Sequence, residues 1–113
     1  MSWGFKFGQP PANIKFDVSY FTNPWREKSI RYLELGGREK ILEFMLKQEG
    51  VHDFCTKIKD LLIQYDKLFP NENIVVAICC SAGEYRSPAI VELVAKMMPD
   101  TNIIINHSGN SKI

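Results

Sequence analysis

The spacing of apolar residues predicts a strand followed by two helices in the first part of the chain. Apolar and polar residues alternate over residues 14–20, which predicts a half-buried strand. Apolar residues then recur at helical spacing over residues 38–47 and 51–69, so we expect two helices there. Gly50 closes the first helix and Pro70 stops the second.

The second part of the chain predicts a parallel strand–loop–helix–strand unit. Residues 74–79 form an unbroken apolar run, which is typical of a strand covered on both faces. Ser87 suits a helix N-cap and Pro88 the first helical position, and helical spacing of apolar residues follows. Residues 103–105 are all isoleucine and predict a last short strand, and residues 108–113 are expected to be a flexible tail.

Together these elements indicate one small α/β domain that spans residues 1–113. We expect a mixed sheet with covering helices, in which a right-handed crossover joins the two parallel strands. A length of 113 residues suits a single domain that folds without disulfide or metal staples. Ligands of such sheets bind at the carboxyl ends of the strands. The loop that begins at Cys80 and the residue His107, which follows the last strand, are both predicted at that edge.

Composition and charge exclude several classes of protein and site. The net charge is +1 and the Lys and Arg residues are spread along the chain, so charge does not support a nucleic-acid partner. The three cysteines include no Cys-x-x-Cys pair, so we expect no disulfide framework, no metal site and a reducing compartment. No apolar run is long enough to span a bilayer, and the N-terminus lacks the apolar core of a signal peptide. We therefore expect a cytoplasmic protein with no membrane partner, and no cofactor is predicted.

The segment between the predicted strand and helix of the second part carries the strongest signal for chemistry. Unpaired amide N–H groups at a helix N-terminus attract anions, and the helix dipole adds positive potential. The guanidinium of Arg86 can hold two phosphate oxygens at once. We therefore predict a site for a phosphate group here, made of main-chain amides, Arg86 and the Ser87 hydroxyl. The predicted ligand-binding residues of this loop are Cys80, Ser81, Ala82, Gly83, Glu84, Tyr85, Arg86 and Ser87.

The same loop supports an enzyme as the alternative hypothesis. Its Cys-x5-Arg spacing resembles the signature of cysteine-dependent phosphatases, which implies Cys80 as nucleophile, Arg86 as clamp and Ser87 as the assisting hydroxyl. The tyrosine-phosphatase signature has His where this chain has Cys79, and nothing in the sequence selects a general acid. Binding without catalysis is therefore the first hypothesis, and a phosphatase is the second.

A resemblance to a known family covers nearly the whole chain. The segments that carry it, in order, are Gly4-Phe5-Lys6-Phe7-Gly8, Phe16-Asp17-Val18, Asn23-Pro24, Ile30-Arg31-Tyr32-Leu33, Val51-His52-Asp53-Phe54, Val76-Ala77-Ile78, the spaced set Cys80, Gly83, Arg86 and Ser87, and His107. This ordered set resembles the C-terminal domain of the RNase adaptor protein RapZ (the YvcJ family). The order of the segments, rather than any single motif, makes the resemblance specific.

The resemblance implies a phosphosugar-binding domain. Such domains resemble a phosphofructokinase substrate domain and bind glucosamine-6-phosphate, and the full-length proteins present a small RNA to a nuclease. Their P-loop nucleotide domain is not expected here, because the chain holds no Gly-x4-Gly-Lys-Ser/Thr motif. The family loop has a basic residue and His where this chain has Glu84 and Tyr85, so the same phosphosugar is not implied. Trp25 and Tyr85 would suit a ligand with a stackable ring, such as a nucleotide.

Four residues outside the loop are also predicted to contact the ligand. They are His107, Lys6, Arg31 and Trp25. Lys6 and Arg31 match family positions that could reach an anion, and without the resemblance each would count as an ordinary exposed charge. We therefore expect a sensor or adaptor domain of the RapZ C-terminal type that binds a phosphosugar or a nucleotide. A protein- or RNA-binding adaptor with a vestigial pocket is a third hypothesis, and the aromatic N-terminal segment would suit a homodimer interface.

Overall fold

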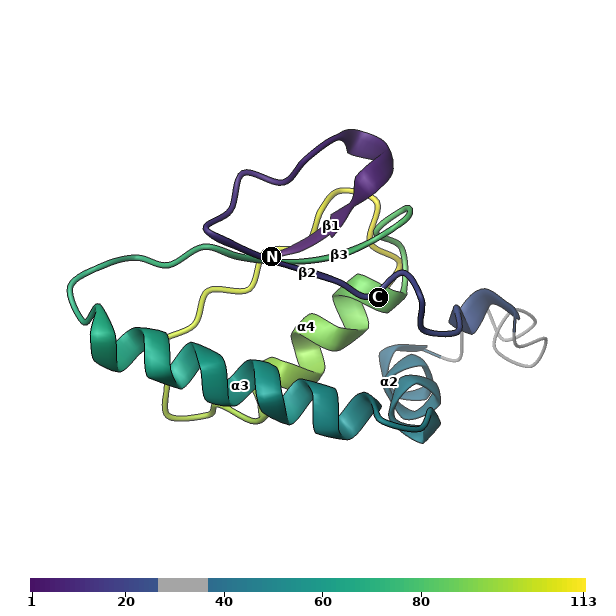
Figure 1. Ribbon diagram of the computed structural model, residues 1–113. Helices are drawn as coiled ribbons and strands as arrows, with labels where there is room; N and C mark the ends of the chain where they lie inside the picture. Colours follow the sequence, from purple (N-terminus) through teal and green to yellow (C-terminus); the bar gives the residue numbers. More distant parts are fainter. Residues whose placement is uncertain (27–36) are drawn as a thin grey trace.

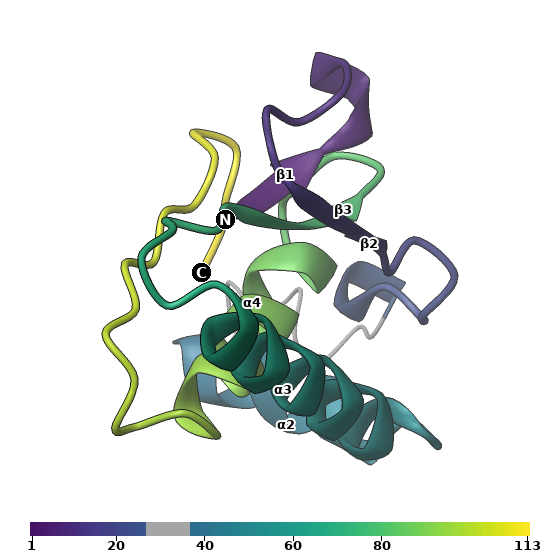
Figure 2. The ribbon, with the colours of Figure 1, turned by 60° about the vertical axis from the view of Figure 1, so that its left-hand side comes forward.

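The computed structural model describes residues 1–26 and 37–113 and shows a three-stranded sheet with helices on one side (Figures 1 and 2). The strands are β1 (Ser2–Gly4), β2 (Ile14–Asp17) and β3 (Val76–Cys80). The α-helices are α2 (Gly37–Lys47), α3 (Val51–Leu68) and α4 (Arg86–Lys96), and the 3-10 turns are η1 (Phe5–Phe7) and η2 (Pro24–Arg26). The predicted α/β class is confirmed. Within the described ranges, no helix is both long enough and apolar enough to cross a membrane.

The strands lie in the order β1-β3-β2, and both pairs are parallel. Gly4 at the end of β1 lies opposite Cys80, and Asp17 at the end of β2 lies opposite Cys79. The antiparallel component of the expected mixed sheet is therefore not seen in the part of the chain that the structure describes. Because all three strands run the same way, their carboxyl ends meet at one edge of the sheet.

The central strand and α4 form the middle of the core. Residues 77–80 of β3 are buried, as predicted for a strand covered on both faces, whereas the start of the apolar run, residues 74–76, is half-buried or exposed and β3 begins only at Val76. All residues from 87 to 94 on α4 are buried, because this helix packs against the sheet, α2 and α3. Ile41 from α2 and Ile58 from α3 close the core and are at most 2% exposed. The loop that joins β3 to α4 is therefore held by a packed element at each end.

The helices confirm the spacing analysis, with one error at the start of α4. The bounds of α2 and α3 agree with the predicted ranges to within one residue at each end. In contrast, α4 begins at Arg86 with Tyr85 as its N-cap, so the prediction of Ser87 as the N-cap is wrong. The Ser87 side chain instead bonds the carbonyl of Trp3 in β1. The hydroxyl therefore makes a tertiary contact in place of the helix-capping contact that the sequence pattern predicted.

The outer parts of the sheet depart most from the predicted pattern. The short β1 was not predicted as an element of the sheet, and β2 ends at Asp17 rather than at residue 20. The strand predicted at residues 103–105 is wrong, because these residues form no strand, and the chain reaches the sheet only two residues later, in an isolated parallel bridge between Ser2 and His107. Ile104 is 89% exposed, so no second layer covers this apolar run and favours a regular strand.

Candidate functional site

The loop of residues 81–85 lies at the carboxyl edge of the sheet and is held by segments that follow β1 and β2. After β1, the amide of Lys6 donates to the carbonyl of Ser81 at 3.0 Å. After β2, the carbonyls of Ser19 and Phe21 accept hydrogen bonds from Nη1 of Arg86. The three strand ends therefore converge on this loop, at the edge where ligands of parallel sheets bind.

The main chain of the loop is oriented by hydrogen bonds from outside it. Besides the bond from the β1 side, the carbonyl of Ala82 accepts from Nδ2 of Asn110 at 2.7 Å, and that of Glu84 accepts from the amide of Lys112 at 2.9 Å. In a trans peptide the N–H points opposite to the carbonyl of the same unit, so these bonds turn the following amides the other way. No hydrogen bond among the described residues uses the N–H groups of residues 82–85. Successive unpaired amides of this kind form anion-binding concavities.

Gly83 is required at its place in the loop for two reasons. Its φ of +72° lies in the left-handed region, which side chains rarely adopt. A Cβ there would lie 2.8 Å from the amide nitrogen of Gly4 and 3.0 Å from Oγ of Ser108. The loop therefore packs tightly on the end of β1 and on the C-terminal segment, and its curvature depends on a glycine at this position.

The guanidinium of Arg86 is directed into the protein at the side of the loop. Its Nη1 is anchored by the two carbonyls that follow β2, and its Nη2 lies 3.5 Å from Oγ of Ser81. Its Nε is buried and has no hydrogen-bond partner among the described residues. Because Nη1 is anchored, Nη2 retains a donor for an oxyanion next to the loop, and Nε is a buried donor without an acceptor among the described residues.

The proposed nucleophile lies beneath the loop. Cys80 is 2% exposed, and its Sγ accepts from the amide of Ser87 and donates to the Ser87 hydroxyl, both at 3.4 Å. The Ser87 hydroxyl in turn donates to the Trp3 carbonyl at 3.3 Å. This chain of contacts ties β3, α4 and β1 together. Attack on a phosphate by Cys80 would require the loop to open, so the phosphatase hypothesis gains no support from the geometry.

The two aromatic residues predicted to stack on a ligand ring stack on each other. The ring centroids of Trp25 and Tyr85 are 6.0 Å apart with an interplanar angle of 10°. Tyr85 is only 4% exposed and belongs to the core, whereas Trp25 is 48% exposed. Burial, with a further contribution from the Glu84 charge, raises the pKa of Tyr85. Stacking of a ligand on Trp25 stays a prediction.

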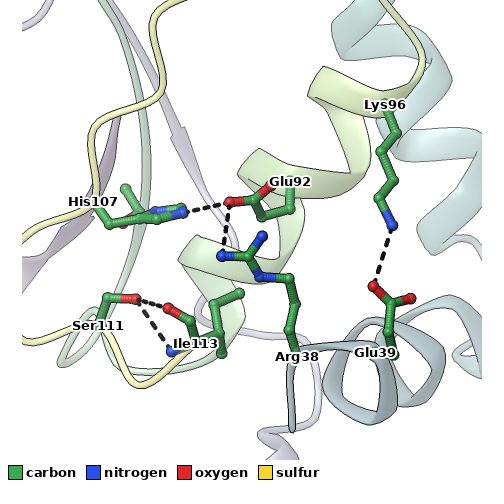
Figure 3. A network of polar contacts seen from close by, with 8 residues as sticks. Arg38, Glu39, Glu92, Lys96, His107, Ser111 and Ile113 are labelled. Carbon is green, nitrogen blue, oxygen red and sulfur yellow. Dashed lines mark hydrogen bonds and ion pairs between the residues drawn. The ribbon is translucent and has the colours of Figure 1, made fainter.

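His107 lies in a polar network that joins the C-terminal segment to β1 and α4. Figure 3 shows the part of it that includes Glu92 and Arg38. Its Nδ1 lies 2.9 Å from Oγ of Ser2, and its Nε2 lies 2.8 Å from Oε1 of Glu92. Arg38 of α2 approaches the same carboxylate oxygen at 3.9 Å. Both ring nitrogens thus have protein partners. Ligand contact by His107 stays a prediction, and its contacts in this structure are those of a residue that fixes the C-terminal segment.

The remaining predicted residues are placed less completely. The main chain of Lys6 contacts the loop, and its exposed side chain lies over the ring of Phe7 at 5.3 Å from the centroid. Arg31 lies outside the described residues. Residues 108–113, predicted as a flexible tail, lie against the loop through Asn110, and their mobility stays a prediction. Asn110 could not be identified from the sequence, because it lies in a polar stretch predicted to be a tail. The carbonyls that anchor Arg86 could not be identified either, because residue type does not indicate a main-chain acceptor.

Comparison with known proteins identifies the family. The RapZ C-terminal domain matches residues 1–110. A protein of Caldanaerobacter subterraneus subsp. tengcongensis, named as a nucleotide-binding protein, is 34% identical over 113 residues, which is 95% of this chain and 39% of the relative. A nucleotide-binding protein of Bacillus cytotoxicus is 32% identical over 117 residues, which is 99% of this chain and 40% of the relative. The chain therefore spans well under half the length of these relatives, and it belongs to the RapZ C-terminal domain family.

Proposed function

We propose that the loop between β3 and α4 binds the phosphate group of a small molecule, a phosphosugar or a nucleotide. The observation that carries the proposal is the row of amides at residues 82–85 for which the described residues offer no acceptor, next to the unpartnered Nε of Arg86. Amides and a guanidinium are the donors that most often hold phosphate oxygens in proteins. In this proposal the domain acts as a sensor or adaptor of the RapZ C-terminal type.

The names of the relatives are compatible with this ligand class. They are called nucleotide-binding proteins, and the chain covers about two fifths of their length, so the nucleotide site of those proteins need not be in the shared part. The proposal therefore depends on the loop and not on the names. We place the protein in the cytoplasm, in keeping with its three free and buried cysteines. A homodimer and an RNA or protein partner are left as hypotheses.

The direct test is an NMR titration of labelled protein with inorganic phosphate. The amide resonances of residues 82–85 should move downfield as the anion accepts their hydrogen bonds. The amides of Lys6 and Lys112 already donate to loop carbonyls and should move less. Shifts spread evenly over the surface, or none near the loop, would contradict the proposal.

Variants of Arg86 provide the second test, by thermal shift with phosphate. A ligand at about 100 times its Kd should stabilise the folded protein by about 2.7 kcal/mol. Arg86→Ala should abolish most of that gain, and Arg86→Lys should keep only part of it, because Lys lacks the planar fork. Lys67→Ala removes the same charge from the exposed end of α3 and is the matched control. An equal loss of stabilisation by phosphate in Lys67→Ala would mean that the effect of Arg86→Ala comes from net charge alone.

Paired compounds then distinguish a phosphosugar ligand from a nucleotide ligand. A sugar phosphate and a nucleoside monophosphate are each compared with the unphosphorylated sugar or nucleoside. The phosphorylated member of a pair should bind and the other should not. The same samples, mixed with an aryl phosphate, test the enzyme alternative, which requires turnover that Cys80→Ser abolishes.

A further inference from the structure

Asn110 connects the C-terminal segment to the loop through one side-chain amide. Its Nδ2 donates to the carbonyl of Ala82 at 2.7 Å and lies 3.4 Å from Oε1 of Glu84. Two residues later, the amide of Lys112 donates to the carbonyl of Glu84. Glu84 is the single acidic residue between Cys80 and Ser87. One amide group thus contacts both a loop carbonyl and the carboxylate closest in sequence to the phosphate site.

We propose that Asn110 is a positioning residue for the phosphate site, an inference that rests on the proposed function. The bond to Ala82 keeps that carbonyl turned outward, so the N–H of Gly83 in the same peptide unit stays turned inward. The contact with Glu84 holds its carboxylate beside the C-terminal segment. A carboxylate that swung toward a bound phosphate would oppose binding by charge repulsion, so restraining it allows an acidic residue to be tolerated in an anion-binding loop.

The C-terminal segment is itself well anchored, which allows Asn110 to act as a fixed donor. The parallel bridge to β1 includes bonds from the Ser2 amide to Asn106 and from the Ser108 amide to the Ser2 carbonyl. Between these residues, His107 is held by Ser2 on one ring nitrogen and by Glu92 of α4 on the other, as Figure 3 shows for Glu92. The segment that carries Asn110 is therefore tied both to the sheet and to the helix that follows the loop.

The test is a double-variant cycle that measures the Kd for inorganic phosphate. Asn110→Ala should weaken phosphate binding about five-fold, the size expected for one hydrogen bond of ~1 kcal/mol. In a Glu84→Gln background the same change should cost less, about two-fold, because the restrained group no longer carries charge. With Glu84 unchanged, the loss should also be larger at about 20 mM than at about 300 mM NaCl, since salt screens the repulsion. Asn102→Ala, an exposed asparagine outside the loop, is the matched control.

The outcomes separate this inference from the proposed function. Should the wild type show no phosphate binding that depends on Arg86, the proposed function fails and this inference fails with it. Should the wild type bind while Asn110→Ala binds equally well, only the positioning role is overturned. If Asn110→Ala loses affinity to the same extent with and without the Glu84→Gln change and at both salt concentrations, the restraint of Glu84 is overturned and only the bond to Ala82 is supported. Urea unfolding checks that each variant is folded, and Asn110→Ser repeats the cycle if the alanine variant is not.

Discussion

Substitution of Gly83 by alanine tests whether the loop packs as tightly on β1 in solution as it does in this structure. Alanine at a left-handed φ of +72° costs about 1–2 kcal/mol by itself. The added Cβ would also lie 2.8 Å from the Gly4 nitrogen, and such overpacking costs about 1–3 kcal/mol. We therefore expect Gly83→Ala to lower the free energy of unfolding by about 2–5 kcal/mol, a large part of the stability of a small domain.

Two other glycines separate the conformational cost from the steric cost. Gly50 has a φ of +83°, and no atom of the described residues lies within 4 Å of the position that a Cβ would take, so Gly50→Ala should show only the first cost, about 1–2 kcal/mol. Gly4 has an ordinary φ of −108°, yet its Cβ would lie 2.4 Å from the carbonyl carbon of Ala82. Gly4→Ala should therefore show only the second cost, about 1–3 kcal/mol.

Equilibrium unfolding in urea, with the m-value checked for each variant, measures the three costs. The expected result is a larger loss for Gly83→Ala than for Gly50→Ala, and a loss for Gly4→Ala that arises from close contact alone. Phosphate affinity should fall in the Gly4 and Gly83 variants, which displace the loop, and stay unchanged in Gly50→Ala. If Gly83→Ala and Gly50→Ala lose equal stability, the close approach of the loop to β1 is refuted, and with it the steric requirement for a glycine in the loop.

Two further predictions concern buried polar groups. Glu92→Ala should destabilise the protein by about 1–3 kcal/mol, because it leaves Nε2 of His107 without its partner. Glu39→Ala breaks the exposed pair with Lys96 that Figure 3 also shows and should cost under about 0.5 kcal/mol. Urea unfolding distinguishes the two variants, and equal costs would contradict the buried network. Burial raises the pKa of Cys55 and Cys79 from 9.0 to about 11, so these thiols ionise at lower pH in the unfolded chain than in the folded protein. The free energy of unfolding should therefore fall as pH rises from 9 to 11, and it should fall less steeply in Cys55→Ala. An unchanged slope in that variant would contradict the burial of the Cys55 thiol.

The elements around the site could be predicted from sequence because local patterns determine them. The apolar stripes of α2 and α3 have helical spacing, and each of these helices buries that stripe against α4. The apolar run before Cys80 is a central strand, and the small residues after it form the turn into a helix. Those features sufficed to place a candidate anion loop at the carboxyl edge of a parallel sheet.

The contacts that complete the site could not be predicted, because they join residues far apart in sequence through main-chain atoms. Any residue at position 19 could offer the carbonyl that Arg86 uses, so Ser19 gives no signal in its side chain. Asn110 lies in a polar stretch that reads as a tail, and only its tertiary position shows that it bonds Ala82. The strand prediction at residues 103–105 failed because it relied on residue type alone. Three isoleucines predict burial, yet Ile104 is almost fully exposed.

The loop's open amides have an energetic consequence for the fold. A donor without an acceptor costs about 1–3 kcal/mol where it is buried, so any of these amides that water does not reach needs compensation elsewhere. Compensation is available from the bonds of Lys6, Asn110 and Lys112 to the loop carbonyls and from the anchoring of Arg86 after β2. The bonds of Lys6, Asn110 and Lys112 use the carbonyl oxygens of the loop, opposite to the N–H groups of the same peptide units. In the proposed function, stability and ligand binding would draw on opposite faces of the same peptide units, so a phosphate would add to the stability of the protein without displacing these bonds.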